Sequence, residues 1–148
     1  MAKGFQVVVD CADPSALSAF WVEALGYKWA DPPEGFASWG EWLLAMGVPE
    51  EEWDPGERPY NKIVDPGGRW PTMWFQRVPE PKTVKNRLHL DLDVTAGRAA
   101  PLDQRRRDVD AEADRLTDLG ARRASVFEPE DHYFIVLQDP EGHEFCLR

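Results

Sequence analysis

Long apolar runs are scarce in this sequence, and basic residues are outnumbered by acidic ones. The chain has 17 lysines and arginines against 27 aspartates and glutamates, for a formal net charge of −10. Nucleic acids and anionic membranes bind basic surfaces, so this balance argues against both as partners. The apolar runs fall short of a membrane span, and the run at residues 5–9 is too short for the core of a signal peptide. We therefore expect a cytoplasmic protein whose partner is a small molecule or another protein.

Cysteine is scarce as well, and several well-known catalytic motifs are missing. The two cysteines are Cys11 and Cys146, and a cytosolic setting favours reduced thiols over a disulfide. The sequence has no glycine-rich phosphate loop, no nucleophile elbow and no CxxC pair. Function must therefore be inferred from side chains that the fold brings together. With 43% apolar residues in 148 positions, the chain can bury the core of one domain.

The most informative pattern is a strict alternation of apolar and polar residues between positions 87 and 94. Successive side chains of a strand point to opposite faces, so this segment predicts a strand with two unlike faces. The residues expected to pack against helices are Leu88, Leu90 and Leu92. The residues expected to face a cavity or solvent are His89, Asp91 and Asp93. A sheet that turns a histidine and carboxylates toward a hollow is a candidate site.

The same order of elements occurs twice along the chain. A strand at residues 5–11 precedes a helix that begins at Pro14 and ends at Gly26, and the strand at 88–94 precedes a helix that ends at Gly120. Strand-like segments follow each helix, at 27–30, 61–64 and 72–78 in the first half and at 122–127, 133–138 and 144–147 in the second.

This order predicts an α+β fold, a single domain in which two βαβββ units form a cupped mixed sheet. Unit one spans residues 3–78, a proline-containing linker spans 79–85 and unit two spans 86–148. The second unit is the longer of the two between its first strand and the end of its helix, because a connection at 95–107 precedes the helix.

An extra amphipathic segment interrupts the first unit. Apolar side chains recur there at helical intervals, at Phe36, Trp39, Trp42, Leu43 and Met46. This stripe predicts an inserted helix near residues 36–47. The helix could serve as a lid over the cup, with Trp39 or Trp42 in contact with the ligand, or it could cover a sheet edge.

Three stretches of the sequence carry a family resemblance. They are the opening at residues 5–14, the stretch from Phe75 to Leu88-His89-Leu90-Asp91, and the ending that begins Asp139-Pro140-Glu141-Gly142. Together with the doubled βαβββ order, they resemble the vicinal oxygen chelate superfamily, and within it the glyoxalase-like domain proteins of the glyoxalase, bleomycin resistance and dioxygenase group. The resemblance covers essentially the whole chain. It implies the cupped fold, which hosts metal-dependent isomerases, dioxygenases, epimerases, thiol transferases and non-catalytic drug-binding proteins.

The resemblance also implies four matched strand positions that hold a divalent metal in catalytic members. By motif alignment these positions fall on Gln6, Gln76, His89 and Cys146. Gln76 stands where the family usually has a carboxylate, and Cys146 stands where it usually has a glutamate. An octahedral metal prefers oxygen and nitrogen donors with carboxylate charge, so this set predicts a degenerate site without a metal cofactor.

The preferred function is the binding of a small apolar or aromatic molecule in the cup, as in drug-sequestering relatives, by a homodimer. The expected ligand-binding residues are Gln6, Gln76, His89, Trp42, Trp74, Asp91, Glu144 and Cys146. An alternative is a lyase, isomerase or dioxygenase that needs a divalent metal held by Gln6, His89 and Glu144. A third interpretation is a protein-interaction module that recruits its partner through the acidic surface and the inserted helix.

Overall fold

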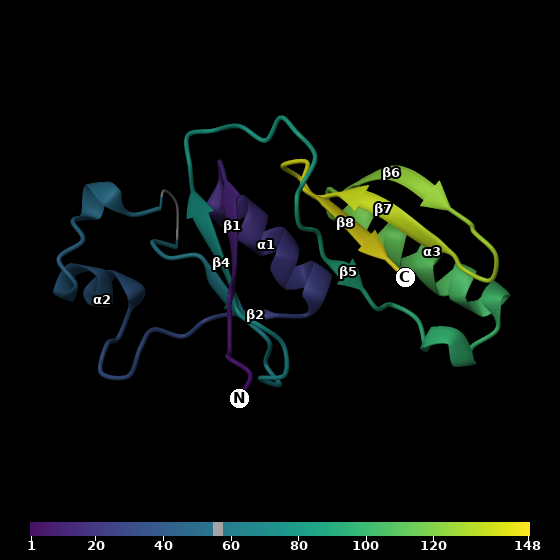
Figure 1. The fold of residues 1–148 in the computed structure, drawn as a ribbon. Helices are drawn as coiled ribbons and strands as arrows, with labels where there is room; N and C mark the ends of the chain where they lie inside the picture. The colour runs from purple at the N-terminus through teal and green to yellow at the C-terminus, as the bar shows by residue number, and fades with distance from the viewer. Residues whose placement is uncertain (55–57) are drawn as a thin grey trace. The chain divides into compact units, whose positions relative to one another are not determined.

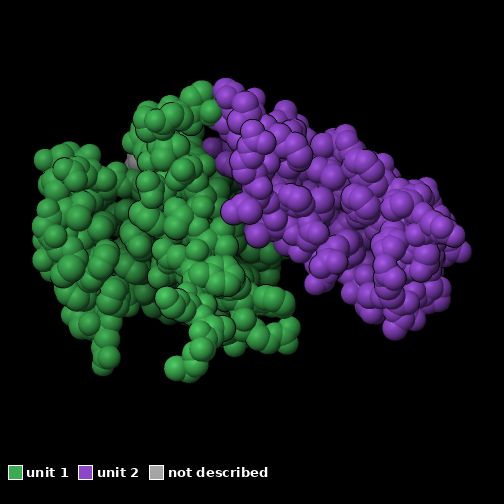
Figure 2. Space-filling model, in the orientation of Figure 1, with its two compact units in different colours: residues 1–81 green, residues 82–148 purple. Residues whose placement is uncertain are grey.

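The chain folds into two compact units, residues 1–81 and residues 82–148, which Figure 2 shows in separate colours. A computed structural model describes residues 1–54 and 58–148. Each unit contains a four-stranded mixed sheet and a helix that packs on it (Figure 1). The two sheets have equivalent strand orders, so the fold is the α+β arrangement of two βαβββ units that the sequence predicts.

The first unit carries an insertion as well as the repeated elements. Its elements are β1 Val7–Cys11, α1 Pro14–Leu25, β2 Lys28–Trp29, α2 Trp39–Ala45, the short 3-10 helix η1 Glu50–Glu52, β3 Lys62–Val64 and β4 Met73–Arg77. The strand order is β1-β4-β3-β2, in which β1 and β4 are parallel and the other neighbours are antiparallel. The helix α2 and η1 lie between β2 and β3, where the second unit has no helix.

The second unit repeats this arrangement. Its elements are β5 Asp91–Leu92, the 3-10 helix η2 Gly97–Ala99, α3 Leu102–Asp118, β6 Arg122–Phe127, β7 Phe134–Gln138 and β8 Glu144–Leu147. The strand order is β5-β8-β7-β6, so β5 takes the place of β1 and β8 takes the place of β4. Again the first and last strands are parallel and the other neighbours are antiparallel.

Local sequence signals set both ends of α1. Asp13 caps the helix by accepting a hydrogen bond from the Ala16 N–H at 3.0 Å, and Pro14 occupies the first turn. Gly26 ends the helix in the left-handed conformation, with φ of 66°. Leu17 of α1 is fully buried in the core of the first unit. None of the helices in the described ranges combines the length and the apolar composition that crossing a membrane requires.

Alternation along β7 and β8 gives the second unit its core. Every second residue of these strands is buried, namely Ile135, Leu137, Phe145 and Leu147. The helix α3 packs on the sheet with a buried stripe formed by Val109, Ala113 and Leu116. The intervening strand residues therefore point to the opposite face of the sheet.

An aspartate-proline turn joins the last two strands of each unit. The fully buried Asp139 accepts hydrogen bonds from the backbone N–H groups of Glu141 and His143, at 3.0 and 2.9 Å, and lies 3.1 Å from His143 Nδ1. In the first unit, Asp65 accepts a hydrogen bond from the Gly67 N–H at 2.9 Å. Each carboxylate thus satisfies the N–H groups of the turn that leads into the last strand.

The first strand of the second unit is shorter than predicted. It spans Asp91–Leu92 in place of 88–94. Leu88 is 88% exposed, so the prediction that it is buried against a helix is wrong, and Leu90 and Leu92 are only half-buried. The reason lies in Asn86, whose side-chain Nδ2 donates to the carbonyl of Glu144 at 3.1 Å. The Glu144 carbonyl thus accepts from a side chain at the point where a backbone hydrogen bond between β5 and β8 would otherwise extend the strand pair.

The helix of the second unit begins earlier than predicted. The sequence predicts a connection from residue 95 to residue 107, whereas α3 begins at Leu102, directly after Pro101. Residues 103–107 are all polar or charged, so they show no apolar periodicity that would reveal the first turns of a helix.

The predicted inserted helix is confirmed as α2, within the range 36–47. The side-chain oxygen of Ser38 caps its N-terminus. Aromatic rings lead from α2 toward the sheet: the ring centroids of Trp42 and Tyr60 lie 5.8 Å apart, and Tyr60 stacks with Trp74 of β4 at 5.7 Å. The role of α2 as a lid and a ligand contact by Trp42 stay predictions.

Replacing Asp139 with alanine removes the buried acceptor of the turn before β8. We expect D139A to lower the free energy of unfolding by about 3 kcal/mol, the upper end of what a hydrogen bond to a charged group contributes. Urea unfolding followed by tryptophan fluorescence measures the change. The matched variant D65A removes a less buried carboxylate and should cost less stability; equal losses would contradict the role assigned to burial of Asp139.

Candidate functional site

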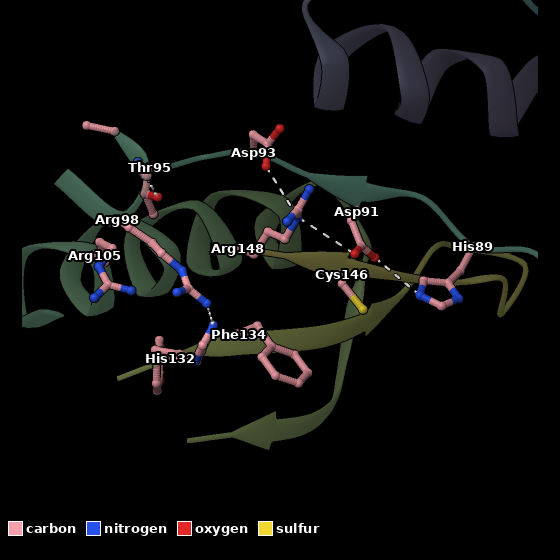
Figure 3. A pocket seen from close by; sticks show the side chains of 13 residues that line it. His89, Asp91, Asp93, Thr95, Arg98, Arg105, His132, Phe134, Cys146 and Arg148 are labelled. Atoms are coloured by element: carbon pink, nitrogen blue, oxygen red, sulfur yellow. Dashed lines mark hydrogen bonds and ion pairs between the residues drawn. The ribbon is translucent and has the colours of Figure 1, made fainter. Parts of the chain in front are cut away.

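The candidate site is a hollow of about 760 Å³ in the second unit. Its lining residues come from β5, β7 and β8 and the residues next to them, from the connection that contains η2, and from Arg105 of α3 (Figure 3). The hollow lies on the face of the sheet opposite α3, because the strand residues that line it alternate with those buried against the helix.

The strand register brings the polar side chains to this hollow. Asp91 pairs with Cys146 between the parallel strands β5 and β8. Leu147 is buried on the helix side, so its neighbour Cys146 points the other way, into the hollow. His89 and Asp91 line the same hollow, on the face that the alternating sequence predicts.

Three potential metal ligands converge on one side of the hollow. His89 Nε2 lies 3.2 Å from Asp91 Oδ1, and one donor atom each from His89, Asp91 and Cys146 lie within 4.8 Å of one another. Within residues 1–54 and 58–148, this is the only cluster of its kind formed by histidine, cysteine, aspartate or glutamate. Figure 3 shows the three side chains gathered beside the ends of β5 and β8. We call them the donor group below.

An arginine balances the carboxylates of this face. Arg148 Nε lies 3.3 Å from Asp93 Oδ1 and 3.7 Å from Asp91 Oδ2. Burial raises the pKa of the Cys146 thiol, and the neighbouring Asp91 carboxylate raises it further. The thiol therefore keeps its proton at neutral pH and is a poor nucleophile.

Glu144 lies on β8 but makes a different set of contacts. Its carboxylate lies 3.1 Å from Lys82 Nζ and accepts a hydrogen bond from the Asn86 N–H at 3.1 Å. Burial acts to raise the pKa of Glu144, but these hydrogen bonds outweigh it and hold the pKa below its ordinary value. Glu144 thus connects β8 to the segment before β5 through an ion pair and a hydrogen bond. Its role as a ligand for a small molecule or metal stays a prediction.

Two of the four predicted ligand-binding residues of the first unit line a separate hollow of about 670 Å³, and Gln6 and Trp42 are not among its lining residues. Trp74 and Gln76 of β4 line it together with Asp54, whose pKa is raised by burial. Gln6 is exposed, precedes β1, and accepts a hydrogen bond from Thr72 Oγ1 at 3.5 Å. The expectation that Gln6 and Gln76 share one pocket with the donor group stays a prediction.

The repeat allows the two units to be aligned residue by residue. In the first unit the Val78 N–H donates to the Cys11 carbonyl, and in the second unit the Arg148 N–H donates to the Leu92 carbonyl. Both bonds join the ends of the parallel strand pair. These equivalent bonds match Cys11 with Leu92 and Val78 with Arg148, and so align β1 with β5 and β4 with β8.

This alignment shows that the matching strand positions of the first unit do not repeat the donor group. The matching residues are Val8, Asp10 and Gln76, so a valine stands at the position of His89. Gln6, which motif alignment matches to the first metal position, lies two residues before Val8 and outside the strand. In this register Val8 is the side chain of the first unit at the depth of His89, and a role of Gln6 in a site stays a prediction.

Sequence reasoning missed other residues of the hollow, notably Arg98, His132 and Phe134. Arg98 and His132 lie in connections without periodicity, so no sequence pattern places them together. Phe134 could have been found, because it alternates with the buried Ile135 along β7.

Comparison with known proteins gives the following matches. The family model of the glyoxalase-like domain matches residues 6–148. A glyoxalase/bleomycin resistance protein/dioxygenase family enzyme from Burkholderia phytofirmans PsJN is similar in structure at 19% identity and TM-score 0.59, over 96% of this chain and 94% of that one. The fosfomycin resistance protein FosX from Mesorhizobium loti is similar at 12% identity and TM-score 0.59, over 99% and 92%.

A third similar structure is a mutant of FosX from Listeria monocytogenes in complex with Mn(II) and 1S,2S-dihydroxypropylphosphonic acid. It has 12% identity and TM-score 0.59, over 100% of this chain and 90% of that one. At these identities the solved structures show the shared fold. The sequence has no significant match among curated proteins.

Removing the Asp91 charge tests the electrostatics of the hollow. In D91N the pKa of Cys146 should fall, because one of the causes that raises it is removed. We expect iodoacetamide to alkylate Cys146 several-fold faster in D91N than in the wild type at mildly alkaline pH, as measured by mass spectrometry. The variant C146S gives the background from Cys11. An unchanged rate would show that Asp91 does not control the thiol.

Proposed function

Because the chain belongs to the glyoxalase-like domain family, we propose that it binds a small organic molecule in the hollow of its second unit. The observation that carries the proposal is the donor group, in which His89, Asp91 and Cys146 converge on the wall of that hollow. Ligand sites combine a concave surface with a few polar groups that fix the orientation of the ligand, and this hollow has both.

The size and the walls of the hollow suit such a ligand. Its volume of about 760 Å³ lies within the range of roughly 300–1,000 Å³ that is typical of ligand pockets. Phe134 supplies an apolar wall and stacks on Phe127, with ring centroids 5.0 Å apart. A small apolar or aromatic molecule with a polar substituent fits this combination.

The polar groups favour binding over covalent catalysis by the protein. Asp91 holds Nε2 of His89 and so orients the ring, while Nδ1 has no hydrogen-bond partner among the described residues. The protonated thiol of Cys146 is a weak hydrogen-bond donor and a poor nucleophile. These residues can position a ligand without a chemical step of their own.

Truncating the apolar wall should weaken binding. We expect F134A to raise the dissociation constant of the neutral aromatic probe 1-naphthol about tenfold, because a buried aromatic side chain contributes about 1–3 kcal/mol. Titration followed by ¹H–¹⁵N NMR measures both the affinity and the residues that shift. V126A, on the exposed strand β6 and outside the hollow, is the matched control and should bind as the wild type does. Unchanged affinity in F134A would place the ligand elsewhere.

A divalent-metal site is the second candidate, and the convergence of three potential ligands in the donor group is the observation behind it. His89, Asp91 and Cys146 offer nitrogen, oxygen and sulfur, which fits a zinc ion with three protein ligands better than the harder manganese ion. When bound, such an ion supplies Lewis-acid polarisation of a substrate oxygen. Cys146 would have to lose its proton, and Arg148 would have to release Asp91, so both residues oppose binding.

Metal analysis separates the two candidates. If the protein binds its ligand without a metal, protein from zinc- and manganese-supplemented cultures should contain far less than one equivalent of either ion. Added zinc should then shift the melting temperature only slightly. Plasma mass spectrometry and thermal shift give the two readouts. Near-equimolar metal that is lost in H89A would overturn the metal-free proposal and establish the second candidate.

A further inference from the structure

We propose that Arg98, positioned by His132, binds an anionic group of the ligand on the side of the hollow away from the donor group. Figure 3 shows the Arg98 and His132 side chains meeting there, apart from His89, Asp91 and Cys146. The inference rests on the proposed function and names the chemical class of the ligand. That class is an organic anion, a carboxylate or a phosphonate, attached to an apolar group.

Arg98 carries a positive charge that no ion pair offsets within the described part of the chain. The other arginines of the hollow are paired: Arg148 lies 3.7 Å from Asp91, and Arg105 lies 2.9 Å from Asp131. Arg98 lines the hollow without a carboxylate partner among the residues that the structure describes. Its positive charge is therefore available to an anion, although the chain as a whole has a net charge of −10. Its planar array of N–H donors matches the oxygen pairs of a carboxylate or a phosphonate.

The hydrogen bonds of His132 define how Arg98 is held. His132 Nδ1 lies 2.9 Å from the carbonyl oxygen of Glu130, which can only accept, so Nδ1 carries a proton. Nε2 faces Arg98 Nη2, which can only donate, so Nε2 is the acceptor of this contact. His132 therefore fixes the guanidinium through one N–H group and leaves the others for a ligand. It is a positioning residue for Arg98.

A buried arginine ties together the two turns that carry this pair. Arg105 of α3 is 7% exposed and donates to the Ala100 carbonyl at 3.1 Å, to the Asp131 carbonyl at 3.1 Å and to Asp131 Oδ1 at 2.9 Å. Ala100 ends the turn of Arg98, and Asp131 immediately precedes His132. Arg105 thus sets the spacing of the two turns before a ligand arrives, which reduces the ordering that binding requires.

The backbone conformation of the turn before β7 is consistent with this restraint by Arg105. Asp131 adopts a left-handed conformation with φ of 53°, and it is the only non-glycine residue with positive φ within the described ranges. Such a conformation persists where the surrounding structure holds it, and the two hydrogen bonds from Arg105 to this residue do so.

The test compares three probes that share a phenyl ring and differ in charge. Benzoate, phenylphosphonate and neutral benzamide are titrated into the full chain and followed by ¹H–¹⁵N NMR. We expect at least one of the anions to bind the wild type about tenfold more tightly than benzamide, as charge-assisted hydrogen bonds to arginine favour. The anion that binds more tightly identifies whether the site suits a carboxylate or a phosphonate.

Variants assign the preference to the proposed residues. R98Q should abolish the preference for the anion, whereas R107Q, which removes the same charge from an exposed position of α3 outside the hollow, should keep it. H132A should reduce the preference and H132Q should restore it, because a glutamine oxygen can accept from Arg98 as Nε2 does. Circular dichroism confirms that each variant is folded.

The outcomes separate this inference from the proposed function. Equal binding of the three probes, a preference that survives in R98Q, or a preference lost equally in R107Q would overturn the anion site. In those cases, shifts at Phe134 and Cys146 would leave ligand binding in the hollow standing. If none of the probes shifts a resonance of the hollow, the proposed function itself fails, and the anion site fails with it.

Discussion

The parallel pairing of the first and last strands is the constraint on which the rest of each unit depends. Parallel neighbours need a long connection, which here contains the helix and the two antiparallel strands. In the second unit this pairing sets Asp91 beside Cys146. The next pair, Leu92 and Leu147, then points to the other face of the sheet, where Leu147 is buried, since successive side chains alternate between the two faces. The core and the hollow are therefore opposite faces of one strand pair.

Many charged groups of the second unit hold its elements together, so the charged or polar groups of the hollow without such contacts are the candidates for binding a ligand. Glu144 ties β8 to Lys82, Asp139 holds the turn before β8, and Arg105 joins the turns around η2 and before β7. The polar contacts of these groups within the protein hold its elements together. His89 and Arg98, by contrast, line the hollow with donor or acceptor atoms that described residues do not occupy. This difference directs the proposals to them.

The two units carry different chemistry on the same backbone plan. Where the second unit has His89, the first unit has Val8. In the first unit, Trp74 of the sheet is connected to α2 by a series of aromatic ring contacts. A histidine supplies a donor and an acceptor, whereas valine supplies only apolar surface. The equivalent strands therefore support a donor group in the second unit and an aromatic wall in the first.

Side-chain periodicity in the sequence determined the α+β class, the doubled unit, the limits of α1, the existence of α2 and the face on which His89 and Asp91 lie. These features follow from local rules, the two-residue period of a strand and the 3.6-residue period of a helix, together with proline and glycine at helix ends. Tertiary structure decided how far each strand extends and which side chains from separate connections meet. The exposure of Leu88 depends on a hydrogen bond between residues 58 positions apart. The meeting of Arg98 with His132 depends on a buried arginine of α3 that binds both of their turns. No local pattern in the sequence predicts such contacts, because each depends on where a segment distant in the sequence lies in the folded chain.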